Sequence, residues 1–235
     1  MSTNTTRQFD LVVFDWDGTL IDSTGAITEA IRSSAADLGL PVPSRERASH
    51  VIGLGLLEAV HYAVPAIARA QIPAFVERYR HHFLRADPDL VPFEGVESLL
   101  AELHTGGAAL AIATGKSRVG LDRALRSTGW GPRFRATRCA DEGAPKPDPW
   151  MLNDICLELE VSPARTLMIG DTTHDLRMAA SAGAGAVAVT YGAHPDDELV
   201  ALGPLAMASS VAELRGWLLP RLGFEAAGGA RAPAA

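Results

Sequence analysis

Hydrophobic residues occur in short runs along the chain, and patterns typical of helices separate most of these runs. The runs are residues 9–14, 109–114, 166–170 and 186–190, and residues 205–209 fit a short last strand. Short apolar runs that alternate with helices are typical of a parallel sheet covered by helices on both faces. The sequence therefore predicts an α/β protein built on a doubly wound, Rossmann-like parallel sheet.

Residues 21–92 break this alternation, because they contain no convincing strand. Apolar side chains recur there at helical spacing, as in residues 27–38, and prolines divide the interval into about four helices. We therefore predict an all-helical cap domain, residues 21–92, inserted into a catalytic core of residues 1–20 and 93–222. The Ala- and Gly-rich tail, residues 223–235, is predicted to be disordered.

Composition narrows the class of protein. The 235 residues are 47% hydrophobic, which is enough to bury a core, and the net charge of -7 argues against a nucleic-acid partner. No apolar segment approaches the roughly 18 residues that cross a bilayer, and the polar N-terminus lacks the pattern of a secretion signal. The two cysteines, Cys139 and Cys156, match neither a zinc site nor a disulfide framework. We expect a cytoplasmic protein with no membrane partner.

Two carboxylates, Asp15 and Asp17, directly follow the first predicted strand. Ligands of doubly wound sheets bind beyond the carboxyl ends of the strands, and alternate residues of an extended chain face the same side. Two acids in such a crevice repel each other unless a cation lies between them, and a set of oxygen ligands suits Mg²⁺. Gly18 would let the backbone approach a ligand closely. Taken alone, the pair also fits a solvated loop or the metal site of a glycosyltransferase.

Thr114 and Gly115 follow the second apolar run, at a predicted helix start. A hydroxyl and free N–H groups at that place form a phosphate cradle, although Thr114 also fits an ordinary helix cap. The string TGKS is not a nucleotide P-loop, because the required first glycine would fall on Leu110, inside the strand.

Lys146 lies in the string KPDP, and only one other lysine, Lys116, occurs among the 21 basic residues. In a chain that otherwise uses arginine, a lysine indicates that its position requires a compact ammonium group. Asp171 and Asp175 follow the apolar run 166–170, where acidic helix capping is the ordinary alternative. An acid pair, a hydroxyl, a lysine and a second acid pair at successive strand ends favour one shared site.

The strings DWDGT, ATGKS, KPDP and GDTTHD together resemble the four motifs of the haloacid dehalogenase superfamily, in the branch that includes phosphoglycolate phosphatase. The resemblance covers about residues 9–218, including the helical cap. It implies that Asp15 is the nucleophile that forms an aspartyl-phosphate. It also implies that Asp17 is the general acid and then the base. Thr114 and Lys146 would hold the phosphoryl group, and Lys146 would also restrain Asp15.

The resemblance further implies a phosphate site that includes Gly18 and Gly115, and Mg²⁺ as the cofactor. The implied metal ligands are the side chains of Asp15 and Asp171 and the main-chain carbonyl of Asp17. Asp175 would either bind the metal as well or orient the site from close by. An acid at position 17 speaks against dehalogenase chemistry, because a halide needs no proton to leave.

The function predicted from the resemblance is hydrolysis of a small phosphomonoester, with phosphoglycolate as an analogy. A pyrophosphatase, a phosphomutase and a non-catalytic phosphate-binding regulator stay open as alternatives. The predicted partner is a small phosphorylated metabolite, and the chain is expected to be a monomer or a homodimer. Gly53, Leu54 and Gly55 fit either the family's cap specificity loop or an ordinary helix–helix turn.

Overall fold

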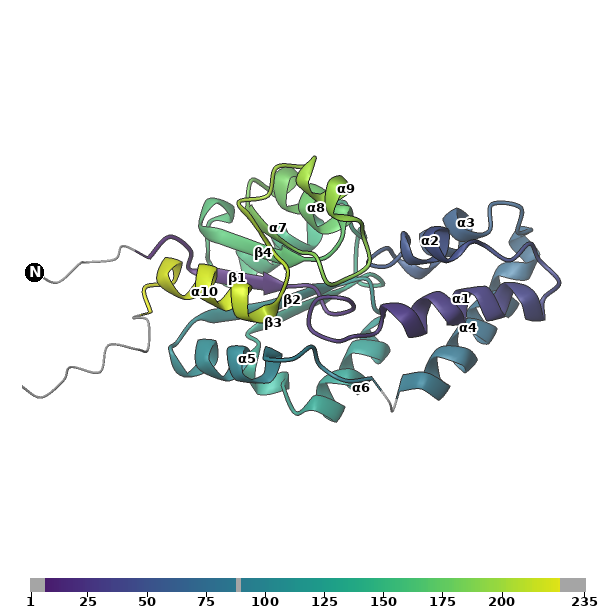
Figure 1. Cartoon of the computed structure of the whole chain (residues 1–235), viewed down its shortest axis with the longest axis horizontal. Helices are drawn as coiled ribbons and strands as arrows, with labels where there is room; N and C mark the ends of the chain where they lie inside the picture. Colours follow the sequence, from purple (N-terminus) through teal and green to yellow (C-terminus); the bar gives the residue numbers. More distant parts are fainter. Residues whose placement is uncertain (1–6, 88–89, 225–235) are drawn as a thin grey trace, which may run out of the picture.

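A six-stranded parallel sheet forms the centre of the structure, a computed structural model that describes residues 7–87 and 90–224 (Figure 1). The strands lie in the order β3-β2-β1-β4-β5-β6. They are β1 (Leu11–Phe14), β2 (Ala109–Thr114), β3 (Ala136–Cys139), β4 (Thr166–Gly170), β5 (Gly185–Val189) and β6 (Ala206–Ala208). The strand order reverses at β1, and the crevice beyond such a switch point is where ligands of doubly wound sheets bind. The predicted fold class is confirmed.

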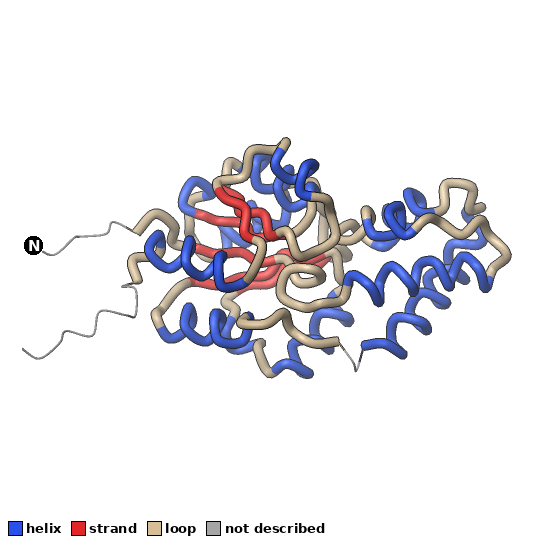
Figure 2. Tube along the Cα trace, in the orientation of Figure 1, coloured by secondary structure: helices blue, strands red, loops and turns tan. Residues whose placement is uncertain are grey.

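Helices cover both faces of the sheet (Figure 2). Val12 and Phe14 of β1 pack in one cluster with residues of α5 and α10, whereas Leu11 and Val13 pack in another with residues of α7 and α8. Alternate side chains of β1 are therefore buried on opposite faces, which explains its uninterrupted apolar sequence. The helices of the core are α5 (Val96–Thr105), α6 (Arg118–Thr128), α7 (Trp150–Glu158), α8 (Thr173–Ala182), α9 (Asp196–Val200) and α10 (Val211–Arg221). Short 3-10 turns lie at η3 (Gly131–Arg133) and η4 (Pro163–Arg165).

The segment between β1 and α5 forms a separate group of helices beyond one end of the sheet (Figure 1). Its helices are α1 (Thr24–Asp37), α2 (Arg45–Ser49), α3 (Leu56–Ala63) and α4 (Ile72–Ala86), with a 3-10 turn at η1 (Arg69–Gln71). They bury a hydrophobic core of their own, centred on Phe75 and Ala35. The helical insertion after the first strand is thus confirmed, and we call helices α1–α4 the cap.

Two connections join the cap to the core, and they run side by side. The Asp22 N–H donates to the Val91 carbonyl at 3.0 Å, and Ile21 forms an isolated antiparallel bridge with Pro92. The predicted boundaries of the cap, residues 21 and 92, fall at this pairing, and the division into domains stays a prediction.

The sequence analysis did not identify β3. Its side chains at Thr137 and Arg138 are only partly buried, because β3 is an edge strand, and the segment therefore lacks an apolar run. Of the tail predicted to be disordered, residues 225–235 lie outside the described residues. Phe224 packs against the core and lies over Gly106, where a Cβ would be 2.2 Å from its ring. None of the described helices is both long and apolar enough to cross a membrane.

Candidate active site

The register of the sheet brings three predicted residues to one edge. Phe14 of β1 pairs with Ile112 of β2 and with Ile169 of β4. Asp15, Thr114 and Asp171 lie one or two residues further along these strands, at their carboxyl ends. These three positions therefore lie together at the edge of the sheet where its switch point is.

Lys146 is fully buried between two carboxylates. Its Nζ lies 2.7 Å from Oδ1 of Asp15 and 2.6 Å from Oδ1 of Asp175, and none of the three side chains is more than 1% exposed. Burial alone would lower the pKa of Lys146, but the negative charges of Asp15 and Asp175 outweigh burial and raise that pKa above its ordinary value. The ammonium therefore stays charged and fixes the orientation of both acids.

The second oxygen of Asp15 has no hydrogen-bond partner. Oδ2 is buried and unpaired within the part of the chain that the structure describes. Burial raises the pKa of Asp15 to about 7; the Lys146 charge opposes this shift, and the charges of Asp175 and Asp17 add to it. A buried unpaired carboxylate oxygen is rare and indicates a place for a further group, such as a cation or a reacting atom.

Asp171 is held by two donors and enclosed by two glycines. The Thr19 hydroxyl donates to its Oδ1 and the Ala193 N–H to its Oδ2, each at 2.8 Å. A Cβ at Gly18 would lie 2.1 Å from Oδ2, and one at Gly192 would lie 2.2 Å from it. Gly18, which has a φ of +84°, is therefore needed for the close approach of the backbone to Asp171.

A metal ion fits among Asp15, Asp171 and Asp175. Each offers a carboxylate oxygen, and these atoms lie within 4.8 Å of one another. Burial and the charges of Asp15 and Asp175 raise the pKa of Asp171. The three carboxylates repel one another, and a cation between them would remove this repulsion. All-oxygen sites suit Mg²⁺.

Asp175 already has partners for both of its oxygens. Oδ1 accepts from Lys146, and Oδ2 accepts from the Thr172 hydroxyl at 2.7 Å and from the Thr172 N–H at 3.2 Å. Asp175 lies in the first turn of α8, whereas Asp171 precedes that helix. This arrangement favours the second of the two predicted roles of Asp175, in which it orients the site by holding Lys146 in place.

Asp17 faces a different set of partners. Its Oδ1 accepts from the Ser23 hydroxyl at 2.6 Å and lies 3.0 Å from Nζ of Lys116. The same Nζ lies 4.7 Å from the centroid of the Phe83 ring on α4, so Lys116 connects Asp17 to the cap. Sequence reasoning noted Lys116 as one of two lysines but did not assign it to the site.

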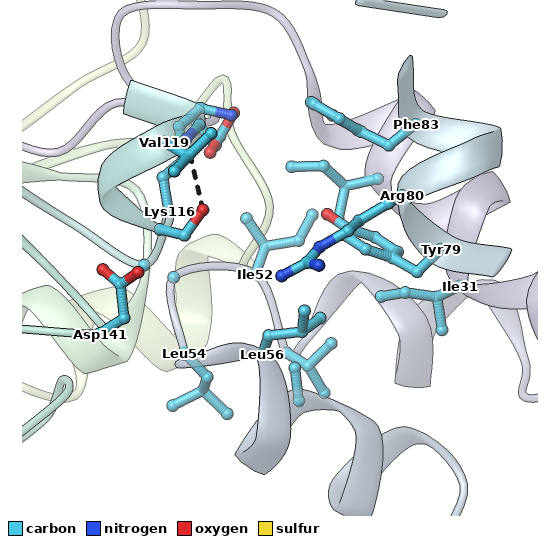
Figure 3. Close-up of a pocket in the computed structure, with 18 of the residues that line it drawn as sticks. Ile31, Ile52, Leu54, Leu56, Tyr79, Arg80, Phe83, Lys116, Val119 and Asp141 are labelled. Carbon is cyan, nitrogen blue, oxygen red and sulfur yellow. Dashed lines mark hydrogen bonds and ion pairs between the residues drawn. The ribbon is translucent and has the colours of Figure 1, made fainter. Parts of the chain in front are cut away.

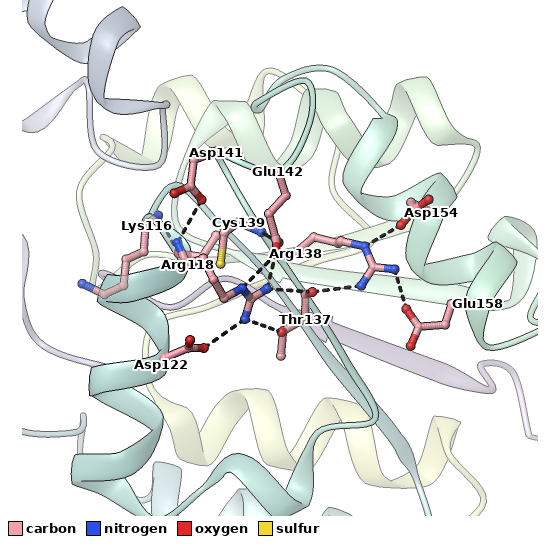
Figure 4. Close-up of polar contacts among 11 residues, drawn as sticks. Lys116, Arg118, Asp122, Thr137, Arg138, Cys139, Asp141, Glu142, Asp154 and Glu158 are labelled. Carbon is pink, nitrogen blue, oxygen red and sulfur yellow. Dashed lines mark hydrogen bonds and ion pairs between the residues drawn. The ribbon is translucent and has the colours of Figure 1, made fainter.

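Polar contacts join the loops that carry the two lysines (Figure 4). The Arg118 N–H donates to Asp141, and its guanidinium donates to both oxygens of Glu142 at 2.8 and 2.9 Å. The Ala140 N–H also donates to the Lys116 carbonyl at 3.0 Å. These bonds fix the start of α6 against the loop after β3, which leads to Lys146.

Glycines bring the cap loop close to the core. A Cβ at Gly115 would lie 2.6 Å from the Gly53 carbonyl oxygen and 2.7 Å from that of Leu54. A Cβ at Gly55 would be 3.3 Å from Pro145. The predicted cap loop, residues 53–55, therefore packs over the loop after β2 that contains Gly115.

Three histidines, which the sequence analysis did not connect, meet at a second contact between cap and core. Nε2 of His174 and Nε2 of His194 lie 3.1 and 3.0 Å from the His50 carbonyl oxygen. Because Nδ1 of His194 accepts from the Thr173 N–H, its Nε2 carries the proton and donates to His50. The end of α2 is thus held by two core side chains.

A cavity of about 370 Å³ lies between cap and core (Figure 3), and Asp15 and Asp17 are among the residues that line it. Residues of α1, α3, α4 and the cap loop line one side, and residues of the loop after β2 and of α6 line the other. Cavities of this size bind small molecules. Two of the predicted acids, Asp15 and Asp17, therefore line a ligand-sized pocket between cap and core.

The fold and the site define an α/β enzyme with buried acids and a buried lysine at the switch point of its sheet. The chain belongs to the family of haloacid dehalogenase-like hydrolases, whose model matches residues 12–189. "Probable phosphatase IndB" of Dickeya dadantii is 37% identical over 213 residues, which cover 88% of this chain and 92% of that protein. Phosphoglycolate phosphatase of Thiobacillus denitrificans is 30% identical over 212 residues, with coverage of 86% and 92%.

Solved structures agree with the fold. The crystal structure of a hydrolase from Pseudomonas syringae matches with a TM-score of 0.81 and 21% identity, over 89% of this chain and 97% of that one. At this identity the likeness shows the fold alone. The family resemblance inferred from the four motifs is confirmed.

Proposed function

We propose that the chain is a Mg²⁺-dependent phosphatase that hydrolyses a small phosphomonoester through an aspartyl-phosphate at Asp15. One observation carries this proposal: Lys146 holds one oxygen of Asp15 at 2.7 Å, while the other oxygen is buried without a partner. A nucleophilic carboxylate needs this combination, because one oxygen must be oriented and the other must be free to bond to phosphorus.

Lys146 and the loop after β2 give the phosphoryl group its binding site. The ammonium offsets the repulsion between the Asp15 carboxylate and a phosphate that is itself negative. The Thr114 hydroxyl, whose oxygen accepts from the Lys116 N–H at 3.2 Å, and the Gly115 N–H are the donors that we assign to the phosphoryl oxygens, just before α6. When bound, Mg²⁺ supplies further charge neutralisation; Asp15, Asp171 and the Asp17 main-chain carbonyl would hold it, with Asp175 orienting Lys146.

Asp17 moves the proton. Its carboxyl lines the cavity beside Asp15, where it protonates the leaving alcohol and then deprotonates the water that cleaves the aspartyl-phosphate. A positioned acid–base group of this kind contributes on the order of 10²–10⁴-fold to the rate. The relatives named as phosphatases support the same reaction class.

Phosphate release from p-nitrophenyl phosphate tests this proposal. We expect turnover with Mg²⁺, loss of turnover on chelation, and no turnover in Asp15→Asn. Asp10→Asn is the matched control, because Asp10 lies just before β1, pairs with Arg165 and does not line the cavity. Full activity in Asp15→Asn would refute the nucleophile assignment. Isomerised product without free phosphate would identify a phosphomutase, and binding without any turnover would identify a regulator.

A further inference from the structure

We propose that the substrate is a phosphate ester of a largely apolar, ring-sized alcohol with an anionic or hydrogen-bond-accepting group at its far end, and that Arg80 binds that group. The inference rests on the proposed function, because it takes the phosphate to lie at Asp15. It goes beyond that function by assigning the chemistry of the leaving alcohol.

The size of the cavity supports a substrate larger than a two-carbon acid. Its volume of about 370 Å³ lies within the range of roughly 300–1,000 Å³ typical of pockets that enclose organic ligands. Asp15 and Asp17 line it together with residues of α1, α3 and α4. A substrate with its phosphate at Asp15 therefore extends its alcohol part toward the cap, and phosphoglycolate would leave most of this space unfilled.

The cap side of the cavity is mainly hydrophobic. Figure 3 shows aliphatic and aromatic side chains that surround the central space from three helices and the cap loop. These residues are Ile27, Ile31, Ile52, Leu56, Tyr79 and Phe83. Such a surface binds an apolar or aromatic body by removing both from water, and it offers nothing to a short charged acid.

Arg80 is the cation of the cavity that is left for a ligand. Lys116 is paired with Asp17 at 3.0 Å, and Arg123 is paired with Asp87 at 2.7 Å. Within residues 7–87 and 90–224, Arg80 has no ion pair and no side-chain hydrogen bond. Its guanidinium extends from α4 into the central space, beside Tyr79 (Figure 3). Guanidinium groups bind carboxylates and other acceptors through paired hydrogen bonds, so Arg80 fits the far end of the substrate.

Three alkyl phosphates test the inference: phosphoglycolate, benzyl phosphate and 4-carboxybenzyl phosphate. All three release an alkyl alcohol, so differences in kcat/KM report mainly on binding of the alcohol part. We expect benzyl phosphate to exceed phosphoglycolate by at least about 10-fold, because of apolar burial. The carboxyl group should add about another 10-fold through Arg80.

Two variants separate the contribution of Arg80 to substrate binding from that of the apolar lining. Arg80→Gln should remove the advantage of 4-carboxybenzyl over benzyl phosphate, so that kcat/KM falls about 10-fold more for the carboxylated ester than for the unsubstituted one. Arg78→Gln is the matched control, because Arg78 is an exposed arginine of α4 that does not line the cavity. Leu56→Trp, which fills part of the cavity, should lower kcat/KM for both benzyl esters about 10-fold more than kcat/KM for phosphoglycolate.

The outcomes that overturn the inference are distinct from failure of the proposed function. If phosphoglycolate is turned over as well as benzyl phosphate, the apolar lining does not select the substrate. An equal loss for all three esters in Arg80→Gln would make Arg80 a structural residue. In both cases the phosphatase assignment stands. No phosphate release from any ester would overturn the proposed function and this inference with it.

Discussion

Nζ of Lys116 lies 3.0 Å from Oδ1 of Asp17 and 4.7 Å from the centre of the Phe83 ring. One side chain of the core thus contacts both the proposed acid–base residue and helix α4 of the cap. The side chains of Lys116 and Asp17 are 9% and 10% exposed, so water screens their attraction only weakly. The contact orients the Asp17 carboxylate when the cap is seated on the core.

Lys116→Met should lower kcat about 10–100-fold, because Asp17 loses the charged partner that orients it. This loss is smaller than the full acid–base contribution, which is on the order of 10²–10⁴-fold. Lys116→Arg should recover part of the rate, since it keeps the charge and the contact with the ring. Steady-state kinetics with p-nitrophenyl phosphate measures both. Arg126→Met, on helix α6 that begins two residues after Lys116, lies outside the cavity and is the control. An unchanged kcat in Lys116→Met would remove Lys116 from the mechanism.

Lys146→Met should abolish turnover and also destabilise the fold. Removing the ammonium leaves Asp15 and Asp175 buried without their shared partner, and breaking a buried pair in this way costs about 3–5 kcal/mol. Urea denaturation without added metal measures the free energy of unfolding. The double variant with Asp175→Asn should recover part of the stability but none of the activity. A loss of stability below about 1 kcal/mol would contradict the role of Lys146 as the partner of both acids.

Gly115→Ala should weaken catalysis by displacing the cap loop. The added Cβ would lie 2.6 Å from the Gly53 carbonyl oxygen, which is backbone and cannot rotate away. We expect kcat/KM to fall at least about 10-fold, a change of roughly 1.4 kcal/mol in transition-state stabilisation. Gly25→Ala in α1 is the matched control, because its Cβ would meet nothing within 4 Å. Equal kinetics in the two variants would show that close packing of the cap loop is not needed.

The histidine contact between cap and core should make stability depend on pH. Burial, together with the charges of His174 and His50, lowers the pKa of His194 to about 4. The unfolded chain then binds more protons than the folded chain between about pH 6.5 and pH 4, so stability falls as the pH falls through this window.

At pH 5 the expected loss from His194 is about 2 kcal/mol relative to pH 7.5. Other acids titrate in the same range, so the measurement is the difference between the wild type and His194→Gln in urea denaturation at both pH values. The wild type should lose more stability than the variant on acidification. Parallel losses in the two proteins would mean that His194 does not carry the effect.

Sequence patterns identified the residues whose role follows from their position at the end of a strand. Asp15 and Asp171 follow apolar strands, and the register of a parallel sheet brings such positions together. Lys146 stood out because lysine is scarce, and the family resemblance implied that it restrains Asp15, whereas its contact with Asp175 was not predicted.

The residues that these patterns missed depend on contacts between distant segments. Lys116 joins Asp17 to Phe83, and His194 joins the core to His50, and neither pairing has a local pattern. The apolar lining of the cavity was equally hidden, because helical spacing marks a buried face without saying whether protein or ligand covers it.

The paired connections at Asp22 and Val91 limit how the cap can move. Since the Asp22 N–H donates to the Val91 carbonyl at 3.0 Å, the two connections leave the core at one place, which is the natural pivot for a motion of the cap. A motion that lifts the cap from the core would break both the contact of Lys116 with Phe83 and the hydrogen bonds of the two imidazoles to the His50 carbonyl. Opening of the cavity and release of the proposed acid–base residue from the cap would then be one mechanical event.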